Sequence, residues 1–492
     1  MQIMADIHKN FVAGFLLIYS QKGNFMRLSE LFSKLNIDER FDFEINRIET
    51  NTKNADDKCL FVAIKGTHVD THEQKYIDEA YQRGTRAFIL EHEVNLPEDS
   101  VSFIVEDTRK TLGLVSSGFF KHPSKDLRVI GVTGTKGKTS VSFIMKELIE
   151  KYGYSCGVIG TSGIFYNGKH FETKNTTPDP FTLQKHLRQA YSEGVKYMII
   201  EVSSQAMKQF RVFGTRFMLS IFTNLSPDHI GPTEHADFDE YRKCKRNFML
   251  LAKKAILNKD DENYGYMIEK MKSPYVSVGH KDADFLIENE TEYEFDLSNH
   301  HIKTNLHGSF NKMNLSLALA SLNEIGFAMG KLETLTDDLK IPGRMEVIDW
   351  ADRKIVIDYA HNKLSLESLL SEIKNWKHNR ILLAVGSVGG RTLERRHEIP
   401  EVANKYVDRV YFTADNPDFE DPNRIIDEMA LHSKIDTKKI TDRATAIKEM
   451  LDSSEAGDII IISGKGDEEH QLINGEKVPY SDKKVVLDYI NK

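Results

Sequence analysis

Hydrophobic and polar residues follow a repeating order along most of the chain, in which a short apolar run precedes an amphipathic stretch. Residues 127–132 (LRVIGV) form such a run and predict a buried strand. After a glycine-rich turn, apolar residues recur at helical spacing. They are Val141, Ile144, Met145, Leu148, Ile149 and Tyr152. A strand, a loop and a helix in this order predict an α/β unit.

The last third of the chain repeats one arrangement, an apolar strand followed at once by a polar signature. The four segments are residues 354–362 (KIVIDYAHN), 380–390 (RILLAVGSVGG), 409–417 (RVYFTADNP) and 458–468 (DIIIISGKGDE). In open α/β sheets, ligands bind outside the carboxyl ends of the strands. We therefore expect a binding site where these signatures meet.

Two passages interrupt the pattern and predict domain boundaries. Residues 120–132 lead from a polar, proline-containing link into an apolar strand, and residues 339–350 lead through Pro-Gly into another strand. At 492 residues the chain is longer than one core usually serves. We predict an α/β fold with three domains, at residues 26–124, 125–341 and 342–492.

Residues 1–25 do not fit this organisation. Residues 26–35 (MRLSELFSKL) begin with Met and continue with an amphipathic pattern, so we expect residues 1–25 to be a translated extension. A real additional helix is the alternative. Residues 11–19 (FVAGFLLIY) weakly resemble the apolar part of a signal peptide, but no small-residue cleavage site follows them.

Composition narrows the functional classes. The net charge is −8 and no basic tail is present, which argues against nucleic acid or an anionic membrane as the main partner. No apolar run reaches the length of a membrane span. The cysteines Cys59, Cys156 and Cys244 lack metal-ligand spacing, so we expect free thiols and a cytoplasmic protein.

Residues 134–140 (GTKGKTS) predict a phosphate-binding loop between the first strand and its helix. The glycines allow backbone N–H groups to approach a phosphate, Lys138 supplies a cation, and Thr139 can hold Mg²⁺. The loop departs from the strict Walker spacing, because Val132 stands where the first glycine would be and Gly134 serves instead. A chance match in a surface turn is the alternative.

Two further strand ends carry polar groups. Residues 197–204 (YMIIEVSS) include Glu201, which could place a carboxylate beside the nucleotide's Mg²⁺, although a capping or solvated glutamate is the simpler reading of Glu201 alone. Residues 217–229 end in Asn224, Asp228 and His229. A lone histidine is more often a structural hydrogen-bonding group than a catalyst.

Together these residues resemble the Mur ligase family, and within it the tripeptide synthetases that add the third residue of the peptidoglycan stem peptide. The resemblance covers residues 26–492. Its ten marks, in chain order, are GTKGKTS at 134–140, NTTPD at 175–179, EVSSQAMKQFRV at 201–212, NLSPDHIG at 224–231, YRKCK at 241–245, GSFNKMN at 308–314, PGRME at 342–346, DYAHN at 358–362, DNPD at 415–418 and GKGDE at 464–468.

The resemblance implies an ATP-dependent ligase. ATP phosphorylates the D-glutamate carboxylate of UDP-N-acetylmuramoyl-L-alanyl-D-glutamate, and the amine of an amino acid then displaces phosphate to form an amide. Mg²⁺ is the implied cofactor, and no organic cofactor is needed. The three domains would be a UDP-binding domain, a P-loop ATPase domain and a Rossmann-like domain for the amino acid. The implied setting is peptidoglycan synthesis in the cytoplasm, by a monomer.

The family's catalytic positions correspond to Lys138, Glu201, His229 and Lys245. By this resemblance Lys245 reacts with CO₂ to become a carbamate and joins Thr139 and Glu201 as a metal ligand. The change is chemically sensible, because an ammonium would repel Mg²⁺ whereas a carbamate offers anionic oxygens. The residues alone read Lys245 as a solvated lysine on a helix face and Lys243 as its surface neighbour.

Three groups of binding residues carry over by the same resemblance. The ATP group is Gly134, Thr135, Lys136, Gly137, Lys138, Thr139, Ser140, Asn311, Arg344, Asp358 and His361. The UDP-muramoyl-dipeptide group is Thr52, Thr67, His68, Thr176, Thr177, Ser203, Gln209 and Arg211. The amino-acid group is Arg391, Asp415, Asn416, Pro417, Asp418, Gly464 and Glu468. Taken singly, many of these residues also read as ordinary caps or strand-end polar groups.

The chain departs from the family's pattern at several positions. Residues 51–53 read Asn-Thr-Lys instead of Asp-Ser-Arg, Gln205 replaces a His, and Asp467 replaces the His of Gly-Lys-Gly-His-Glu. Family members that use meso-diaminopimelate resemble Asp-Asn-Pro-Arg where this chain has Asp418. A carboxylate there would repel the substrate's second carboxylate and attract a distal ammonium. We therefore expect L-lysine, with L-ornithine or diaminopimelate as alternatives and a solvated turn residue as the simpler reading of Asp418.

Two other functions compete with this interpretation. Folylpolyglutamate synthetases share the phosphate loop and the acyl-phosphate chemistry, but they lack a UDP-binding first domain and the signature at residues 415–417. A catalytically silent scaffold of the same fold is the other candidate. The retention of Lys138, Thr139, Glu201 and Lys245 argues against it.

Overall fold

The computed structural model describes residues 25–66, 69–228, 230–231, 234–390 and 392–491. Most of the expected extension, residues 1–24, lies outside the described residues, as do the four predicted site residues Thr67, His68, His229 and Arg391. The chain divides into two compact units. Unit 1 takes in the described residues up to Glu290 with Phe295–Ile302 and Met313–Leu335, and unit 2 comprises Thr291–Glu294, Lys303–Lys312 and residues from Thr336 onward.

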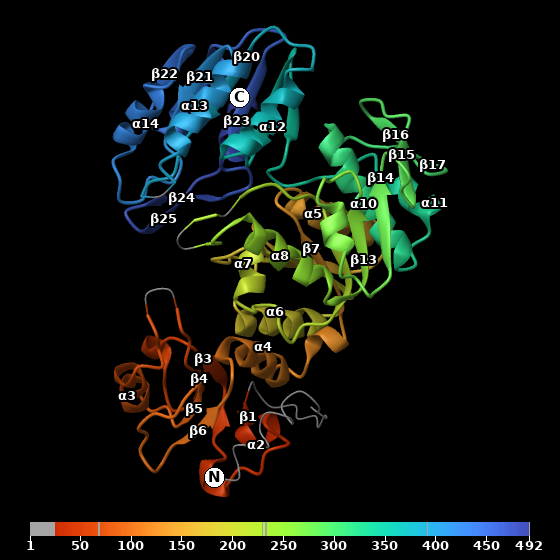
Figure 1. Cartoon of the computed structure of the whole chain (residues 1–492). Helices are drawn as coiled ribbons and strands as arrows, with labels where there is room; N and C mark the ends of the chain where they lie inside the picture. Colours follow the sequence, from red (N-terminus) through yellow and green to blue (C-terminus); the bar gives the residue numbers. More distant parts are fainter. Residues whose placement is uncertain (1–24, 67–68, 229, 232–233, 391, 492) are drawn as a thin grey trace. The chain divides into compact units, whose positions relative to one another are not determined.

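The N-terminal part of unit 1 is built on a four-stranded parallel sheet. Its order is β3 (Arg47–Glu49), β4 (Cys59–Val62), β5 (Ala87–Leu90) and β6 (Val101–Ile104). The helices are α2 (Leu28–Leu31), α3 (Gln74–Gln82) and α4 (Thr108–Phe119), and a small ladder joins β1 (Met26–Arg27) to β2 (Glu44–Ile45). Apolar residues on both faces of the sheet are buried, which is typical of a parallel sheet covered on both sides. The α4 helix lies beside α6 (Pro180–Ser192) of the next layer (Figure 1).

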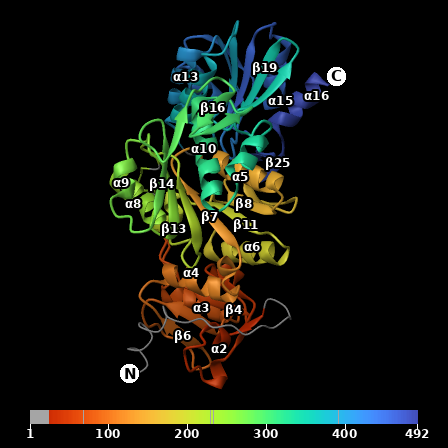
Figure 2. The ribbon, with the colours of Figure 1, turned by 90° about the vertical axis from the view of Figure 1, so that its right-hand side faces the viewer.

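An eleven-stranded mixed sheet forms the rest of unit 1. Its order is β10 (Lys169–Phe171), β9 (Gly163–Tyr166), β8 (Cys156–Gly160), β11 (Tyr197–Glu201), β7 (Arg128–Thr133), β12 (Phe217–Phe222), β13 (Ala252–Asn258), β14 (Tyr275–Gly279), β15 (Phe285–Glu288), β16 (Glu294–Leu297) and β17 (His300–Lys303). The run from β8 to β15 is parallel, and antiparallel pairs extend it at both ends (Figure 2).

Helices cover this sheet. The α5 helix (Lys138–Tyr152) packs on β7, β8 and β11, and α8 (Phe238–Met249) packs on β12 and β13. The shorter helices are α7 (Ser204–Lys208), α9 (Tyr264–Ile268) and α11 (Met329–Leu332), and α10 runs over Ser309–Glu324. The helical stripe predicted from the sequence is buried except at Tyr152, which is half-buried. The predicted strand, loop and helix are thus confirmed.

Unit 2 holds a six-stranded sheet in the order β18 (Glu346–Trp350), β19 (Arg353–Asp358), β23 (Ile459–Ser463), β20 (Ile381–Val385), β21 (Arg409–Phe412) and β22 (Asp436–Lys439). Only β18 is antiparallel to its neighbour. The helices α12 (Lys363–Ile373), α13 (Arg395–Tyr406) and α14 (Pro422–Ala430) enclose one core (Figure 1). The helices α15 (Arg443–Asp452) and α16 (Asp482–Ile490) enclose the other (Figure 2).

Each predicted strand of unit 2 ends where its polar signature begins. The strands β19, β20, β21 and β23 end at Asp358, Val385, Phe412 and Ser463. A hairpin of β24 (His470–Ile473) and β25 (Glu476–Pro479) follows the last signature. The α/β fold is confirmed, whereas the exact domain boundaries stay a prediction. Among the described residues, no helix is long and apolar enough to cross a membrane, and all three cysteines are unpaired thiols.

Candidate active site

The loop between β7 and α5 is shaped by two glycines. Gly134 and Gly137 have φ angles of +152° and +80°, in the region that disfavours residues with a side chain. A Cβ on Gly134 would lie 1.9 Å from Thr223 Oγ1, and a Cβ on Gly137 would lie 2.6 Å from Asn314 Oδ1. Glycine at these two positions therefore lets the loop adopt these φ angles and pack against Thr223 and Asn314.

Lys138 begins α5 and folds back over this loop. Its Nζ donates hydrogen bonds to Gly134 O at 2.9 Å and to Thr135 O at 3.0 Å. Asn224 and Tyr241, which lie outside the loop, hold it in place. Lys136 N donates to Asn224 Oδ1 at 2.9 Å, and Thr135 Oγ1 lies 3.0 Å from Tyr241 OH. The cation is thus held at the loop that would cradle a phosphate.

Thr139 and Glu201 place two oxygen donors beside the loop. The Thr139 hydroxyl donates to Glu201 Oε2 at 3.0 Å, and Thr161 donates to the same carboxylate from its hydroxyl at 3.1 Å and from its N–H at 3.3 Å. Glu201 is completely buried, so it is neither a solvated residue nor a helix cap. A Cβ on Gly160 would lie 2.1 Å from Glu201 Oε1, which explains the glycine on the adjacent strand.

These oxygens suit Mg²⁺, which favours carboxylates and hydroxyls and usually takes further ligands from phosphates and water. Within the part of the chain that the structure describes, no group of three or more His, Cys, Asp or Glu side chains could hold a metal by itself. Thr139 and Glu201 would therefore supply only part of the coordination of an Mg²⁺ ion, and the nucleotide phosphates and water would supply the rest.

Lys245 lies on α8, where the sequence alone suggested a solvated lysine. The structure corrects that reading, because the side chain is buried and its Nζ donates to Gly134 O at 2.7 Å and lies 4.6 Å from the Tyr241 ring centre. Burial, and secondarily the charge of Lys138, lowers the pKa of Lys245 well below its ordinary value. Lys243 is exposed, as expected. The packing of α8 on the loop places Lys245 inside.

A second cluster lies next to Glu201 and contains predicted substrate residues. Thr177 Oγ1 donates to Glu201 O at 2.7 Å, and Arg211 donates to Thr177 O at 2.8 Å and to Gln209 Oε1 at 2.8 and 3.1 Å. Ser203 caps α7, because its Oγ accepts from Ala206 N at 3.1 Å. The structure thus gathers these predicted residues at one edge of the central sheet.

Two other predicted substrate residues are Thr176, which belongs to that cluster, and Thr52, which does not. Thr176 joins it through a contact of 3.1 Å between its hydroxyl and that of Thr161. Thr52 lies in the N-terminal part instead, where it is buried and donates to Glu79 Oε2 at 2.7 Å. Sequence reasoning did not single out Thr161 or Tyr241. Tyr241 stands within the motif YRKCK, whereas Thr161 has no sequence signal beyond its place after a buried strand.

In unit 2, Asp358 ends β19 and organises the turn around it. Its carboxylate accepts from Met345 N and Ala360 N, both at 2.7 Å. The Arg344 guanidinium lies 4.2 Å from the Tyr359 ring centre. Burial, and then the charge of Arg395, lowers the pKa of His361. Asn311 is buried near the start of α10, where its amide donates to His307 O at 2.9 Å.

Three of the predicted amino-acid residues of unit 2 contact a lysine that sequence reasoning missed. Lys465 is completely buried, and its Nζ lies 2.8 Å from Glu468 Oε2, 3.0 Å from Asn416 Oδ1 and 3.4 Å from Asp415 Oδ1. An ammonium has three N–H donors, so these acceptors use all of them. Gly464 precedes it with φ +117°, at the end of β23. The two strand ends are therefore joined through one buried cation.

Asp418 occupies a turn against the hairpin of β24 and β25. It has φ +52°, its N–H donates to Leu472 O at 2.9 Å, and its Oδ1 accepts from Gly475 N at 2.8 Å. Pro417 precedes it, and a Cβ on Gly389 would lie 2.0 Å from Pro417 O. The Asp418 carboxylate thus has a structural role in holding the hairpin turn.

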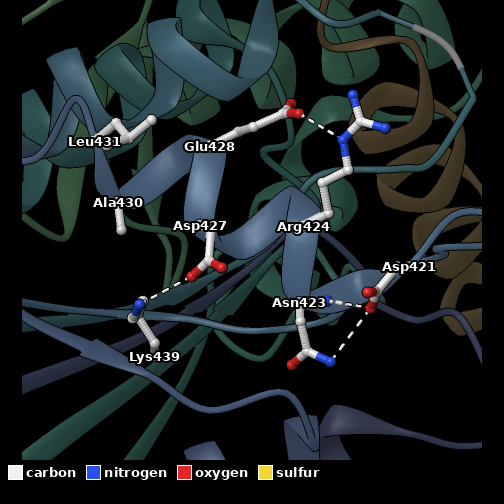
Figure 3. Close-up of a pocket in the computed structure, with 8 residues that line it drawn as sticks. All are labelled: Asp421, Asn423, Arg424, Asp427, Glu428, Ala430, Leu431 and Lys439. Carbon is white, nitrogen blue, oxygen red and sulfur yellow. Dashed lines mark hydrogen bonds and ion pairs between the residues drawn. The ribbon is translucent and has the colours of Figure 1, made fainter.

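Unit 2 also has a surface pocket, which Figure 3 shows with the residues that line it. Its lining consists of Asp421, Asn423, Arg424, Asp427, Glu428, Ala430, Leu431 and Lys439. Lys439 pairs with Asp427 at 2.8 Å and Arg424 pairs with Glu428 at 3.0 Å, so the pocket's charges largely neutralise one another. It contains none of the predicted site residues.

Comparison with known proteins gives two matches to family models. Residues 132–322 match the Mur ligase middle domain, and residues 343–466 match the glutamate ligase domain of Mur ligases. The two matches cover the phosphate loop and the strand ends of unit 2.

Whole-length relatives agree with these matches. The chain is 34% identical over 458 residues to a UDP-N-acetylmuramoyl-L-alanyl-D-glutamate–2,6-diaminopimelate ligase of Aquifex aeolicus, which covers 91% of this chain and 94% of the relative. It is 33% identical over 499 residues to UDP-N-acetylmuramyl-tripeptide synthetase 2 of Oceanobacillus iheyensis, at 95% and 99% coverage. A solved structure of a diaminopimelate ligase of this kind matches with a TM-score of 0.69 and 27% identity, covering 95% of this chain and 99% of that one.

Proposed function

Since this chain belongs to the Mur ligase family, as one of its ATP-dependent tripeptide synthetases of peptidoglycan synthesis, we propose that it joins L-lysine to UDP-N-acetylmuramoyl-L-alanyl-D-glutamate. The D-glutamate carboxylate attacks the γ-phosphorus of ATP, and ADP leaves. The lysine amine then attacks the acyl carbon, the bond to phosphate breaks, and the nitrogen loses a proton. We place this reaction in the cytoplasm, in a monomer.

The arrangement around Gly134 is the observation that carries the proposal. Lys138 is preorganised over the loop, where its charge would stabilise the phosphoryl group during transfer. Thr139 and Glu201 would hold Mg²⁺. The ion would neutralise phosphate charge when bound. Little covalent chemistry falls to the protein, which acts by position and charge.

We further propose that Lys245 carries a carbamate. Burial lowers the pKa of Lys245 and so favours its neutral amine, which is the form that can attack the carbon of CO₂. An N–C bond forms, the nitrogen loses one proton, and an anion replaces the amine. The product would add a negative oxygen pair at the phosphate loop, where Lys245 Nζ now contacts Gly134 O, and this suits a site for Mg²⁺ and phosphate.

The choice of L-lysine rests on charge in unit 2. Asp415, Asp418 and Glu468 are acidic, and Lys465 is the cation that the structure places among Asp415 and Glu468. Diaminopimelate carries a second carboxylate that this surplus of negative charge would disfavour, whereas lysine carries a distal ammonium. The relatives named above for diaminopimelate are about one-third identical to this chain, so their amino acid does not transfer by name.

The test is a ligation assay with L-lysine, L-ornithine and meso-diaminopimelate at equal concentration, with ADP release and tripeptide formation both measured. Asp418→Asn is the informative variant, because asparagine keeps an oxygen for Gly475 N and tolerates positive φ while it removes the charge. Asp418→Arg is the second variant.

We expect wild type to prefer lysine and Asp418→Asn to lose part of that preference, with its melting temperature unchanged. Preference of the wild type for diaminopimelate would refute the lysine assignment and leave the ligase assignment standing. Absence of ligation with every amino acid, in a folded protein, would refute the ligase assignment for this substrate.

A further inference from the structure

The α4 helix of the N-terminal part makes unusually close contact with the turn that follows α7. A Cβ on Gly113 would lie 2.6 Å from Phe213 O, and a Cβ on Gly214 would lie 2.6 Å from Gly113 O. Ser117 Oγ donates to Gly214 O at 2.9 Å. The backbones approach this closely only because glycines stand at both places, so the middle of α4 is held against the turn at residues 213–214.

This contact brings two arginines together from distant parts of the sequence. Arg109 lies in the first turn of α4, and Arg211 lies in the turn after α7. Lys110, next to Arg109, lies with its Nζ 5.0 Å from the ring centre of Phe210, the residue before Arg211. The contacts of α4 with this turn therefore place Arg109 and Arg211 on facing segments, and the charge of Arg109 is among the causes that lower the pKa of Arg211.

Neither guanidinium has an ionic partner among the described residues. Arg109 donates to a neutral acceptor, Lys65 O, at 2.8 Å. Arg211 donates only to Thr177 O and to the amide oxygen of Gln209. No carboxylate of the described chain lies within salt-bridge distance of either group. Partly buried arginines are ordinarily paired, because an unpaired charge loses its hydration without compensation.

The nearby carboxylates are used elsewhere. Asp107 caps α4 by accepting from Lys110 N at 2.9 Å, and Asp179 caps α6 by accepting from Thr182 N at 3.0 Å. Glu91 accepts from Thr108 N and its hydroxyl, both at 2.9 Å. Burial lowers the pKa of both arginines in spite of these neighbours. The pair therefore has an excess of positive charge that an incoming anion would relieve.

We propose that Arg109 and Arg211 together bind the diphosphate of the UDP-linked substrate. Two guanidinium groups match a group with two negative charges, and the planar fork of arginine suits phosphate oxygens. Arg109 also contacts Lys65, in the loop after β4 that leads into the segment expected to meet uridine. The inference rests on the proposed substrate. It gives Arg211 a specific part of that substrate and adds Arg109, which no motif had indicated.

The experiment measures equilibrium binding by calorimetry, without ATP or amino acid. The probes are UDP-N-acetylmuramoyl-L-alanyl-D-glutamate and the same muramoyl-dipeptide without UDP. The proteins are wild type, Arg109→Met, Arg109→Lys and the control Arg40→Met. Arg40 is an exposed arginine of the same part, paired only with Asp38.

We expect Arg109→Met to weaken binding of the UDP-linked probe about 10- to 100-fold, because its charge-assisted hydrogen bonds are lost. Arg109→Lys should weaken binding less, because lysine keeps the positive charge. Affinity for the probe without UDP should not change, and Arg40→Met should match wild type with both. An equal loss for both probes would overturn the diphosphate assignment in favour of a carboxylate or a structural role. Unchanged binding in Arg109→Met would overturn it outright.

Failure of the proposed function gives a different result. If binding of the UDP-linked probe depends on Arg109 but wild type forms no tripeptide with any amino acid, the proposed reaction is refuted and the proposed diphosphate site is supported. If wild type forms tripeptide and binding of the UDP-linked probe does not depend on Arg109, the proposed reaction is supported and the proposed diphosphate site is refuted.

Discussion

Lys138 and Lys245 donate hydrogen bonds to one acceptor, the carbonyl oxygen of Gly134, at 2.9 and 2.7 Å. Two ammonium groups on one oxygen would repel each other. Burial first, and then the charge of Lys138, lowers the pKa of Lys245 well below its usual range. The two lysines therefore differ in their electrostatic setting on the same loop, which agrees with the roles that we propose, Lys138 as the cation for phosphate and Lys245 as the amine that forms a carbamate.

Replacement of Lys245 tests the carbamate. We expect Lys245→Ala to reduce ligation about 100-fold or more, because the site loses a group placed for transition-state charge. Short carboxylic acids should restore part of the rate by supplying the missing anion. Wild-type activity should fall when bicarbonate and CO₂ are removed. The exposed neighbour Lys243 offers a control, since Lys243→Ala should stay near wild type. Indifference of wild type to bicarbonate would argue against the carbamate.

Lys138→Ala isolates the phosphate cation. The variant should fold normally, because the Lys138 ammonium bonds to two carbonyls of a partly exposed loop, but kcat should fall about 100-fold or more. Lys146→Ala on the same helix is the matched control, because its ion pair with Glu150 is a surface pair of small energetic value. Near-normal turnover in folded Lys138→Ala would be incompatible with the proposed phosphate site.

Lys465 is expected to position the amino-acid site. Lys465→Met removes the cation that joins Asp415, Asn416 and Glu468, so KM for the amino acid should rise about tenfold or more. KM for ATP should change little, which distinguishes this effect from general damage. Lys439→Met, in the surface pocket of Figure 3, is the control. A parallel rise in both KM values would indicate a structural role only.

His280 should give unit 1 a pH-dependent contribution to stability. Burial lowers the pKa of His280, but hydrogen bonds to Asp260 and Glu290 outweigh it and raise the pKa above its ordinary 6.5. The group is half exposed, so the effect is small. Because the folded pKa is the higher one, the stabilisation is complete below about 6.5 and is lost as pH rises through the raised value.

Comparison of wild type with His280→Gln by thermal melting from pH 5.5 to 9 tests this. The difference in melting temperature should be largest at the acidic end and shrink toward the alkaline end. A difference that is constant across that range would show that the ring contributes by packing and not by charge.

Local pattern explains which features could be predicted from the sequence. The phosphate loop depends on glycines between a buried strand and an amphipathic helix, so Gly134, Lys138 and Thr139 could be identified from a few adjacent residues. The strand ends of unit 2 follow from apolar runs that stop at polar signatures. Each of these patterns lies within a few adjacent residues, and the folded structure has the local conformation that the pattern predicts.

The remaining features depend on contacts between distant segments. Lys245 reads as a surface lysine because Lys243 and Arg246 beside it are charged, although it shares a helix face with buried residues, and the packing of α8 against the loop buries it. Arg109 follows a helix cap and shows no sign of its partner Arg211, about a hundred residues later in the sequence. Lys465 sits among glycines, and its acceptors Asp415 and Asn416 come from another strand end. These residues can be seen in the sequence, but local patterns do not show that they lie close together in the fold.

The hydrogen bond from Gly475 to Asp418 constrains how this enzyme's selectivity could change during evolution. Replacement of Asp418 by arginine would change the charge at the proposed amino-acid site and would also remove the acceptor that closes the hairpin turn. Both effects come from the same side chain, so this replacement cannot produce one without the other. A route from this chain to one with arginine at that position should therefore pass through compensating substitutions around residues 474–475, and the order in which they arise matters.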